Sequence, residues 1–171
     1  KNTMSQEKKY DVFISYSRKD SAIADEICKA FDQVGITYFI DREEIKIEKD
    51  YIEKIANGID NSKIVLFLAS TTSYTSKYVN IELKYAFDKE VLILPYQIDN
   101  AAITKKYQML LSSVNWYNIN EHPINPKLIE TIAEHVGKEI DFDEINKSVE
   151  PNPLEVKKVV NEESKIRMSE T

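Results

Sequence analysis

Hydrophobic positions along this 171-residue chain follow two alternating patterns, short continuous runs and longer segments with helical spacing. The continuous runs predict five β-strands, at residues 10–17, 36–40, 63–69, 91–98 and 114–119. Segments with an apolar residue every three or four positions predict helices, at residues 21–34, 51–62, 77–89 and 126–136. Because strands that alternate with helices form parallel βαβ units, we predict an α/β fold, a flavodoxin-like five-stranded parallel sheet with helices on both faces.

The helical spacing also predicts which side chains face the sheet. In the second helix the expected inward positions are Ile52, Ile55, Ala56 and Ile59. In the third helix they are Val79, Leu83, Ala86 and Phe87. We expect Tyr78, Glu82 and Tyr85 together on the flank of the third helix, because residues three and four apart lie on one face.

Catalytic and ligand-binding residues are expected in the loops at the carboxyl ends of the strands, where open parallel sheets bind their ligands. The segment 73–86 leads from one such loop into a helix, and it brings the Tyr78 ring next to the Glu82 carboxylate. A purely structural interpretation competes with a functional one: Glu82 would then be exposed and would pair with Lys77 or Lys89. Spacing alone favours the structural interpretation.

Two further segments at the same edge carry polar side chains, although each is a weak signal alone. The first strand ends in Ser15 and Ser17 and continues into charged residues, a pattern that can donate hydrogen bonds to a phosphate or a ribose. The loop 41–50 is densely charged. Most of its charges are expected to be solvated, with Arg42 and Lys46 placed to meet an anionic ligand.

The composition excludes several classes of function. The three glycines, Gly35, Gly58 and Gly137, lie far apart, which excludes both the GxGxxG turn and the phosphate-binding P-loop. We therefore expect no NAD held as a reusable cofactor, and we interpret Gly35 and Gly137 as helix stops. A single cysteine and the lack of Cys/His clusters in the sequence argue against a bound metal.

The net charge and the lengths of the apolar runs argue against two classes of partner, nucleic acids and membranes. A net charge of −6 argues against nucleic acid as the main partner, because phosphate binding needs a basic surface. The longest apolar runs, 64–69 and 91–94, are too short to cross a membrane. No signal peptide is visible. We therefore expect a cytoplasmic protein that does not bind membranes.

Two known arrangements of catalytic residues do not fit. A phosphoacceptor receiver domain shares this sheet class, but it needs an aspartate at the end of the third strand, where this chain has Ser70. His122 and His135 have no evident nucleophile partner, which argues against Ser/His or Cys/His catalysis. Cys28 is expected to be a small core residue of the first helix.

Three stretches taken together resemble the TIR (Toll/interleukin-1 receptor/resistance) domain family, over about residues 8–138. The run YDVFISYS at 10–17 resembles the family's first-strand box. Residues 38–41, with the charged segment that follows, are similar to its second strand and BB loop. Residues 76–83 resemble the box around its third helix. Residues 139–171 are then expected to form a charged C-terminal tail or linker, or else a helix that packs on a partner or leads into another domain.

The resemblance implies a choice between two activities. Many TIR domains assemble with other TIR domains, and many bacterial and plant members also cleave NAD⁺ to nicotinamide and ADP-ribose or a cyclic ADP-ribose isomer. In the enzymes a helix glutamate within a W-x-x-x-E pattern is essential. Here the pattern reads Tyr78-Val-Asn-Ile-Glu82, with tyrosine in place of tryptophan. We therefore predict a bacterial-type enzyme with NAD⁺ as its substrate and Glu82 as its catalytic residue.

The resemblance also implies binding residues and partners. Ser17 and Arg18 correspond to family positions that line the NAD pocket, and Lys46 matches a basic BB-loop position near the ligand's phosphates or ribose. Tyr78 would stack on a ring of the dinucleotide. Glu48 stands where a BB-loop glycine is common. Enzymatic members complete their active site by head-to-tail self-assembly with other TIR domains, and the implied role is bacterial immune defence.

Two alternatives stay open. In the first, the chain is a non-catalytic adaptor that binds other TIR domains or mimics a host TIR domain. In the second, it is a nucleoside hydrolase or deoxyribosyltransferase that uses the same carboxylate on a smaller substrate. The pair Tyr78 and Glu82 favours the enzyme over the adaptor, because an adaptor surface needs no carboxylate in the crevice.

Overall fold

Five parallel strands form one sheet within residues 7–42 and 49–143, the residues that this computed structural model describes. In chain order the strands are β1 (Tyr10–Ser15), β2 (Tyr38–Ile40), β3 (Ser62–Ala69), β4 (Leu92–Gln97) and β5 (Tyr117–Asn118). They lie in the order β2-β1-β3-β4-β5, and every neighbouring pair is parallel. This is the strand order of flavodoxin-like sheets, so the predicted fold class is confirmed.

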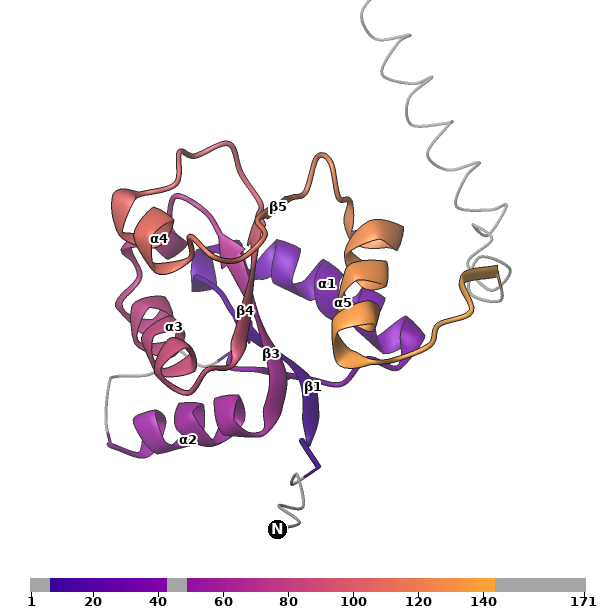
Figure 1. Cartoon of the computed structure of the whole chain (residues 1–171), viewed down its shortest axis with the longest axis horizontal. Helices are drawn as coiled ribbons and strands as arrows, with labels where there is room; N and C mark the ends of the chain where they lie inside the picture. The colour runs from indigo at the N-terminus through magenta and orange to yellow at the C-terminus, as the bar shows by residue number, and fades with distance from the viewer. Residues whose placement is uncertain (1–6, 43–48, 144–171) are drawn as a thin grey trace, which may run out of the picture. The chain divides into compact units, whose positions relative to one another are not determined.

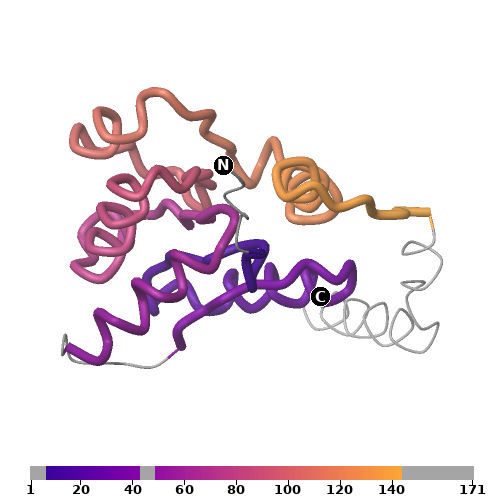
Figure 2. The backbone as a smooth tube through the Cα atoms, turned by 60° about the horizontal axis from the view of Figure 1, so that its bottom comes forward, coloured from indigo at the N-terminus to yellow at the C-terminus, as the bar shows by residue number. Residues whose placement is uncertain are grey.

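Helices cover both faces of the sheet (Figure 1). On one face lie α1 (Ser21–Val34) and α5 (Ile129–Val136), and on the other lie α2 (Lys49–Asp60), α3 (Lys77–Asp88) and α4 (Lys105–Leu110). In Figure 2 the orange coil of α5 and the magenta coils of α3 are again on opposite sides of the molecule. The predicted helices are confirmed, whereas the hydrophobic pattern misses α4, whose six residues are too few for a periodic signal.

The two edge strands are much shorter than the pattern predicts. The strands β2 and β5 are the edges of the sheet, where each pairs on one side only, and they span three and two residues. The α-helical part of the last helix begins at Ile129, and a π-helical segment, Ile124–Leu128, precedes it with a break at Asn125, whose backbone is extended (φ −111°, ψ 123°). The residue before a proline disfavours the helical conformation, and Pro126 follows Asn125.

Side chains that alternate along the central strands build the core on each face of the sheet. One layer packs under α2, α3 and α4 and includes Phe13, Val65, Phe67, Ile93, Ile55, Leu83 and Tyr107. In β3, residues 64–69 are buried without interruption, as the continuous apolar run predicts for a central parallel strand. Cys28 on α1 is also buried, which confirms that it is a core residue.

Two of the predicted inward positions are wrong. Ile52 is 47% exposed and Phe87 is 52% exposed. In α2 the buried face runs instead through Tyr51, Ile55 and Ile59, so Ile52 lies at the edge of that face. Phe87 follows the buried Ala86, and one step along a helix turns a side chain by about 100°, away from the sheet.

Gly58 lets α2 approach the sheet closely. A Cβ atom at this position would lie 3.1 Å from the rings of Phe13 and Phe39, which stack on one another. The other two glycines have positive φ angles, +73° at Gly35 and +71° at Gly137, and they end α1 and α5 as predicted. In the described part of the chain, no helix combines the length and the apolar character needed to cross a membrane.

Candidate active site

A pocket of about 430 Å³ opens at the carboxyl ends of β1 and β3, the edge of the sheet where parallel folds bind ligands. Its lining comes from the loop after β1 and from the segment between β3 and α3: Tyr16, Ser17, Arg18, Lys19, Thr72, Thr75, Ser76, Lys77 and Tyr78. Three of these side chains are cationic and four are Ser or Thr hydroxyls, and none of these described lining residues is acidic. Such a lining suits an anionic ligand.

Short polar contacts shape the two loops that line the pocket. The Ser17 hydroxyl accepts a hydrogen bond from the Lys19 N–H (3.4 Å), and the Ser76 hydroxyl caps α3 by accepting one from the Val79 N–H (3.3 Å). Ser and Thr are favoured at such positions because their oxygens satisfy the free N–H groups of a helix start. The sequence therefore fixes where each loop turns into a helix.

Asp20 joins the two loops that line the pocket. Its Oδ2 atom accepts hydrogen bonds from the Ser70 hydroxyl (2.6 Å) and the Thr72 hydroxyl (2.9 Å). Ser70 and Thr72 follow β3, whereas Asp20 follows β1, so one carboxylate fixes the spacing between neighbouring strand ends. Asp20 also begins α1, as its N-cap residue.

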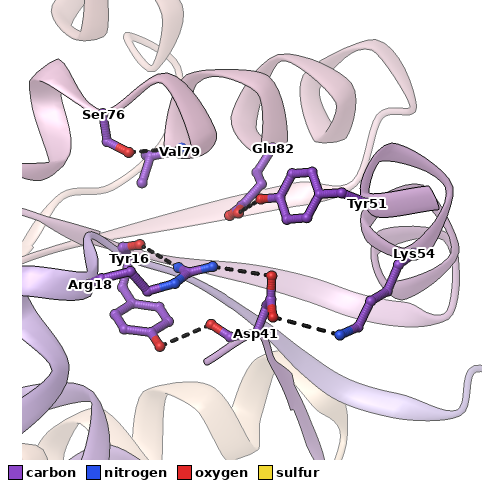
Figure 3. Close-up of polar contacts among 8 residues, drawn as sticks. All are labelled: Tyr16, Arg18, Asp41, Tyr51, Lys54, Ser76, Val79 and Glu82. Atoms are coloured by element: carbon purple, nitrogen blue, oxygen red, sulfur yellow. Dashed lines mark hydrogen bonds and ion pairs between the residues drawn. The ribbon is translucent and has the colours of Figure 1, made fainter. Parts of the chain in front are cut away.

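Glu82 lies on α3 one helical turn after Tyr78, and it is only 2% exposed. The Tyr51 hydroxyl on α2 donates a hydrogen bond to Glu82 Oε1 at 3.4 Å, and the two groups point toward one another in Figure 3. The second carboxylate oxygen, Oε2, is buried and has no hydrogen-bond partner among the described residues. The interpretation of Glu82 as an exposed residue paired with Lys77 or Lys89 is therefore wrong.

Burial raises the pKa of the Glu82 carboxyl to about 7, because a charge in this environment loses its hydration. The nearby Ser15 hydroxyl, the Arg18 charge and the Tyr51 hydroxyl all oppose that rise. Near neutral pH, both the ionised and the neutral forms of Glu82 are therefore populated. A carboxyl group tuned to this range in a strand-end crevice is typical of a functional site.

Arg18 is held in place by the backbone of β1's end and by a buried aspartate. Its guanidinium donates to the Tyr16 carbonyl oxygen (3.2 Å) and to Asp41 Oδ2 (3.2 Å), and it lies 4.8 Å from the Tyr16 ring centroid. Lys54 Nζ on α2 lies 3.6 Å from the other oxygen of Asp41, which is 4% exposed. Figure 3 shows this row of contacts beneath Glu82. The Arg18 charge is thus fixed at the pocket wall.

The structure brings most of the predicted site residues together. Ser17, Arg18 and Tyr78 line the same pocket, and Glu82 lies one turn farther along α3. Tyr85 is on the same flank, but its hydroxyl donates to Asp60 at 2.9 Å. The predicted binding residue Lys46 lies outside the described residues. The roles of these residues stay predictions.

Sequence reasoning missed two residues that contact the site, Tyr51 and Asp41. The spacing of Tyr51, Ile55 and Ile59 at every fourth position carries a signal for Tyr51, since it marks an alternative inward face of α2. No comparable signal exists for Asp41, whose partner Arg18 is distant in the sequence.

Comparisons with known proteins agree with this geometry. The chain matches the TIR domain family over residues 12–132. It is 30% identical over 95 residues to the putative cyclic ADP-D-ribose synthase TIR2 of Cytobacillus dafuensis, and this match covers 50% of this chain and 24% of that protein. It is 28% identical over 88 residues to the probable 2′ cyclic ADP-D-ribose synthase TcpO of Methanobrevibacter olleyae, and this match covers 51% of this chain and 26% of that protein. The chain thus spans about a quarter of the length of these curated relatives.

Among solved structures, the fold is similar to the TIR domain of the Toll-related receptor TRR-2 from Hydra magnipapillata. The TM-score is 0.62 and the sequence identity is 15%, with 76% of this chain and 100% of that chain covered. At this identity the likeness concerns the fold alone.

Proposed function

This chain belongs to the TIR domain family, and from that premise we propose that it cleaves NAD⁺ at the nicotinamide–ribose bond, with Glu82 as the catalytic residue. The observation that carries the proposal is the buried Glu82 carboxylate beside a pocket lined by cations and hydroxyl groups. The names of the two relatives, both cyclic ADP-D-ribose synthases, support an NAD-type substrate.

The reaction asks little of the protein's acid–base groups. When the bond between the ribose C1′ and the pyridinium nitrogen breaks, the electron pair goes to that nitrogen, so nicotinamide leaves as a neutral molecule. No general acid is needed to protonate it. The ribosyl centre that forms is an oxocarbenium ion, as in glycoside hydrolysis. A water molecule then adds to C1′ and loses a proton. In a cyclisation, an adenine nitrogen or a ribose hydroxyl of the substrate's own adenosine adds instead, loses a proton and closes a ring.

Glu82 would stabilise that developing positive charge in its ionised form. A carboxylate held in a water-poor site interacts strongly with a nearby cation, and it can also accept hydrogen bonds from the ribose hydroxyls. The buried position of Glu82 and its unpartnered Oε2 atom fit this role. With NAD⁺ as the substrate, no separate cofactor is required.

The pocket beside Glu82 offers groups for the remainder of the dinucleotide. Arg18 and Lys77 line it, together with hydroxyls such as that of Ser17, and these groups suit the diphosphate. Tyr78 would stack on a ring of the substrate and would hold the second base if the product is cyclic. Lys46 is proposed near the phosphates or the ribose by family resemblance.

The finer parts of the proposal follow from the family. We expect head-to-tail self-assembly to complete the active site, which makes an isolated domain less active than a clustered one. Heterologous contacts of this kind give filaments rather than closed dimers. A role in bacterial immune defence through NAD⁺ consumption, at a cytoplasmic location, is part of the same proposal.

The test is the incubation of concentrated protein with NAD⁺, followed by chromatographic separation of nicotinamide, ADP-ribose and cyclic products. We expect nicotinamide release by the wild type, increased by clustering the protein on a surface. Glu82→Ala should abolish release, with a loss of at least about 100-fold. Glu130→Gln on the opposite face of the sheet is the control, since Glu130 is exposed on α5.

The outcomes separate the possibilities. No nicotinamide release by the clustered wild type rejects the enzyme and favours the adaptor. Equal release by Glu82→Ala and wild type keeps the activity but rejects Glu82 as its catalytic residue. Cleavage of nicotinamide riboside in preference to NAD⁺ would favour a nucleoside hydrolase.

A further inference from the structure

We propose that Tyr51 is a positioning residue for Glu82: its hydroxyl holds one carboxylate oxygen in place and leaves the other directed to the substrate. The inference rests on the proposed NAD⁺ cleavage and extends it to α2. It begins from the unequal surroundings of the two Glu82 oxygens. Oε1 accepts the Tyr51 hydrogen bond, whereas Oε2 accepts none with regular geometry among the residues that the structure describes. The buried Ser15 hydroxyl, which also lacks a regular hydrogen bond, is near enough to Glu82 to lower its pKa.

Tyr51 is itself fixed in position. Its side chain is buried, with 3% of the residue exposed, and its ring meets the ring of Tyr78 edge-to-face, with centroids 5.4 Å apart and planes at 84°. Tyr78 lines the pocket. The side chain of Tyr51 therefore contacts the pocket wall through its ring and the Glu82 carboxylate through its hydroxyl. The close approach of α2 at Gly58 supports this placement from the far end of the helix.

The Tyr51 hydroxyl is suited to act as a donor. Burial and the neighbouring Glu82 carboxylate raise the pKa of Tyr51, so its proton stays in place at physiological pH. A donor to Oε1 restricts the rotation of the carboxylate and therefore fixes the direction of Oε2. A buried acceptor without a partner destabilises the fold, and such groups in proteins call for an explanation. A ribose hydroxyl of the substrate would supply the missing donor.

The same face of α2 also supports the cation of the pocket. Lys54 lies three residues after Tyr51, so the two side chains leave the helix on one side. Lys54 pairs with Asp41, and Asp41 pairs with Arg18. One turn of α2 thus contacts both Glu82 and the group that holds Arg18.

The charged and titratable groups around Glu82 determine the direction of the expected effect. They are Ser15 from β1, Arg18 from the loop after β1, Asp41 from the end of β2, and Tyr51 from α2. Arg18, Ser15 and Tyr51 lower the pKa of Glu82, whereas burial and Asp41 raise it. Removal of the Tyr51 hydroxyl takes away one of the lowering contributions, so the pKa of Glu82 rises further.

The first experiment compares the steady-state kinetics of Tyr51→Phe with those of the wild type. Phenylalanine keeps the ring that packs on Tyr78 and removes only the donor. We expect kcat to fall roughly tenfold and KM to stay within about twofold, because a misdirected carboxylate stabilises the transition state less without affecting substrate binding. The control is Tyr85→Phe on the last turn of α3. It also removes a tyrosine hydroxyl that is bonded to a carboxylate, in this case that of Asp60 at the end of α2.

The second experiment does not depend on activity. The Glu82 side-chain carbon is followed by NMR during a pH titration of ¹³C-glutamate-labelled protein, with Glu82→Gln used to assign its signal. In Tyr51→Phe the titration midpoint should move to higher pH by roughly half a unit to one unit. In Tyr85→Phe it should not move. Thermal unfolding checks that both variants are folded.

The outcomes distinguish this inference from the proposed function. A wild type that releases no nicotinamide rejects the proposed function, while the titration still decides whether Tyr51 holds Glu82. A wild type that cleaves NAD⁺ beside a Tyr51→Phe variant with unchanged kcat, or with an unmoved Glu82 titration, overturns the inference and leaves the function standing. A fall in kcat together with an upward titration supports it.

Discussion

Two buried carboxylates, Asp11 and Glu82, lie near opposite ends of β1, and their surroundings move their pKa values in opposite directions. Asp11 is near the amino end of the sheet. Burial by itself raises its pKa, but hydrogen bonds from the Thr37 N–H (3.0 Å), from Lys138 (2.9 Å) and from Lys63 (3.0 Å) outweigh burial and lower the pKa to about 2. Asp11 is thus ionised and fully paired.

Glu82, near the carboxyl end, has one long hydrogen bond and an unpartnered oxygen among the described residues. Burial dominates there and raises the pKa to about 7. The difference shows how one sheet uses buried acids for two purposes. Complete pairing at Asp11 ties α5's end to β1 and β3 and stabilises the fold. Incomplete pairing at Glu82 lowers stability, and under the proposed function it leaves a carboxylate oxygen for the substrate.

The largest expected contrast is in the pH dependence of catalysis. Because Glu82 must be ionised to stabilise the ribosyl cation, kcat/KM should rise about tenfold per pH unit from pH 5 and level off above pH 7, a total change of about 100-fold. Asp11 is already ionised throughout this range, so Asp11→Asn should keep the same profile. Initial rates of nicotinamide release across the pH range measure it. A profile that is flat between pH 5 and 7 would contradict the assignment of Glu82.

The next contrast is in the stability contribution of Asp11. Its folded pKa of about 2 lies below the ordinary aspartate value of 3.8, so the ionised form is favoured by folding. The stabilisation is complete above about pH 4 and is lost as the pH falls toward 2. Asp11→Asn should therefore lower the free energy of unfolding by roughly 2 kcal/mol at pH 7. Urea unfolding at pH 7 and at pH 2.5 tests this, and an equal effect at both pH values would argue against it.

The last expected effect has the opposite sign. The folded pKa of Glu82 lies above 4.5, so the folded state holds the proton more tightly, and stability falls as the pH rises from about 4.5 to 7. Glu82→Gln removes that penalty, so it should raise the free energy of unfolding by roughly 3 kcal/mol at pH 8 and leave it nearly unchanged at pH 4.5. Thermal unfolding at the two pH values measures the difference. A destabilised variant at pH 8 would show that the charge of Glu82 supports the fold.

Much of the fold was predictable from residues close in sequence. The uninterrupted apolar run at 64–69 predicts a central parallel strand, and Gly35 and Gly137 mark helix ends through their positive φ angles. The predicted burial is wrong where packing against residues far along the chain decides whether a side chain is exposed. Ile52 and Phe87 have the right spacing for the core, but the helix rotation against the sheet leaves them at the surface.

The candidate site divides in the same way. The sequence by itself determined the parallel α/β architecture, the loops that meet at its carboxyl edge, and the position of Tyr78 one helical turn before Glu82, because helical and strand periodicities are local properties of the chain. Only the tertiary structure decided that Glu82 is buried, that Tyr51 meets its carboxylate, and that Asp41 fixes Arg18. These contacts join residues on different elements, and the distances between them are set by how α2 and α3 pack on the sheet.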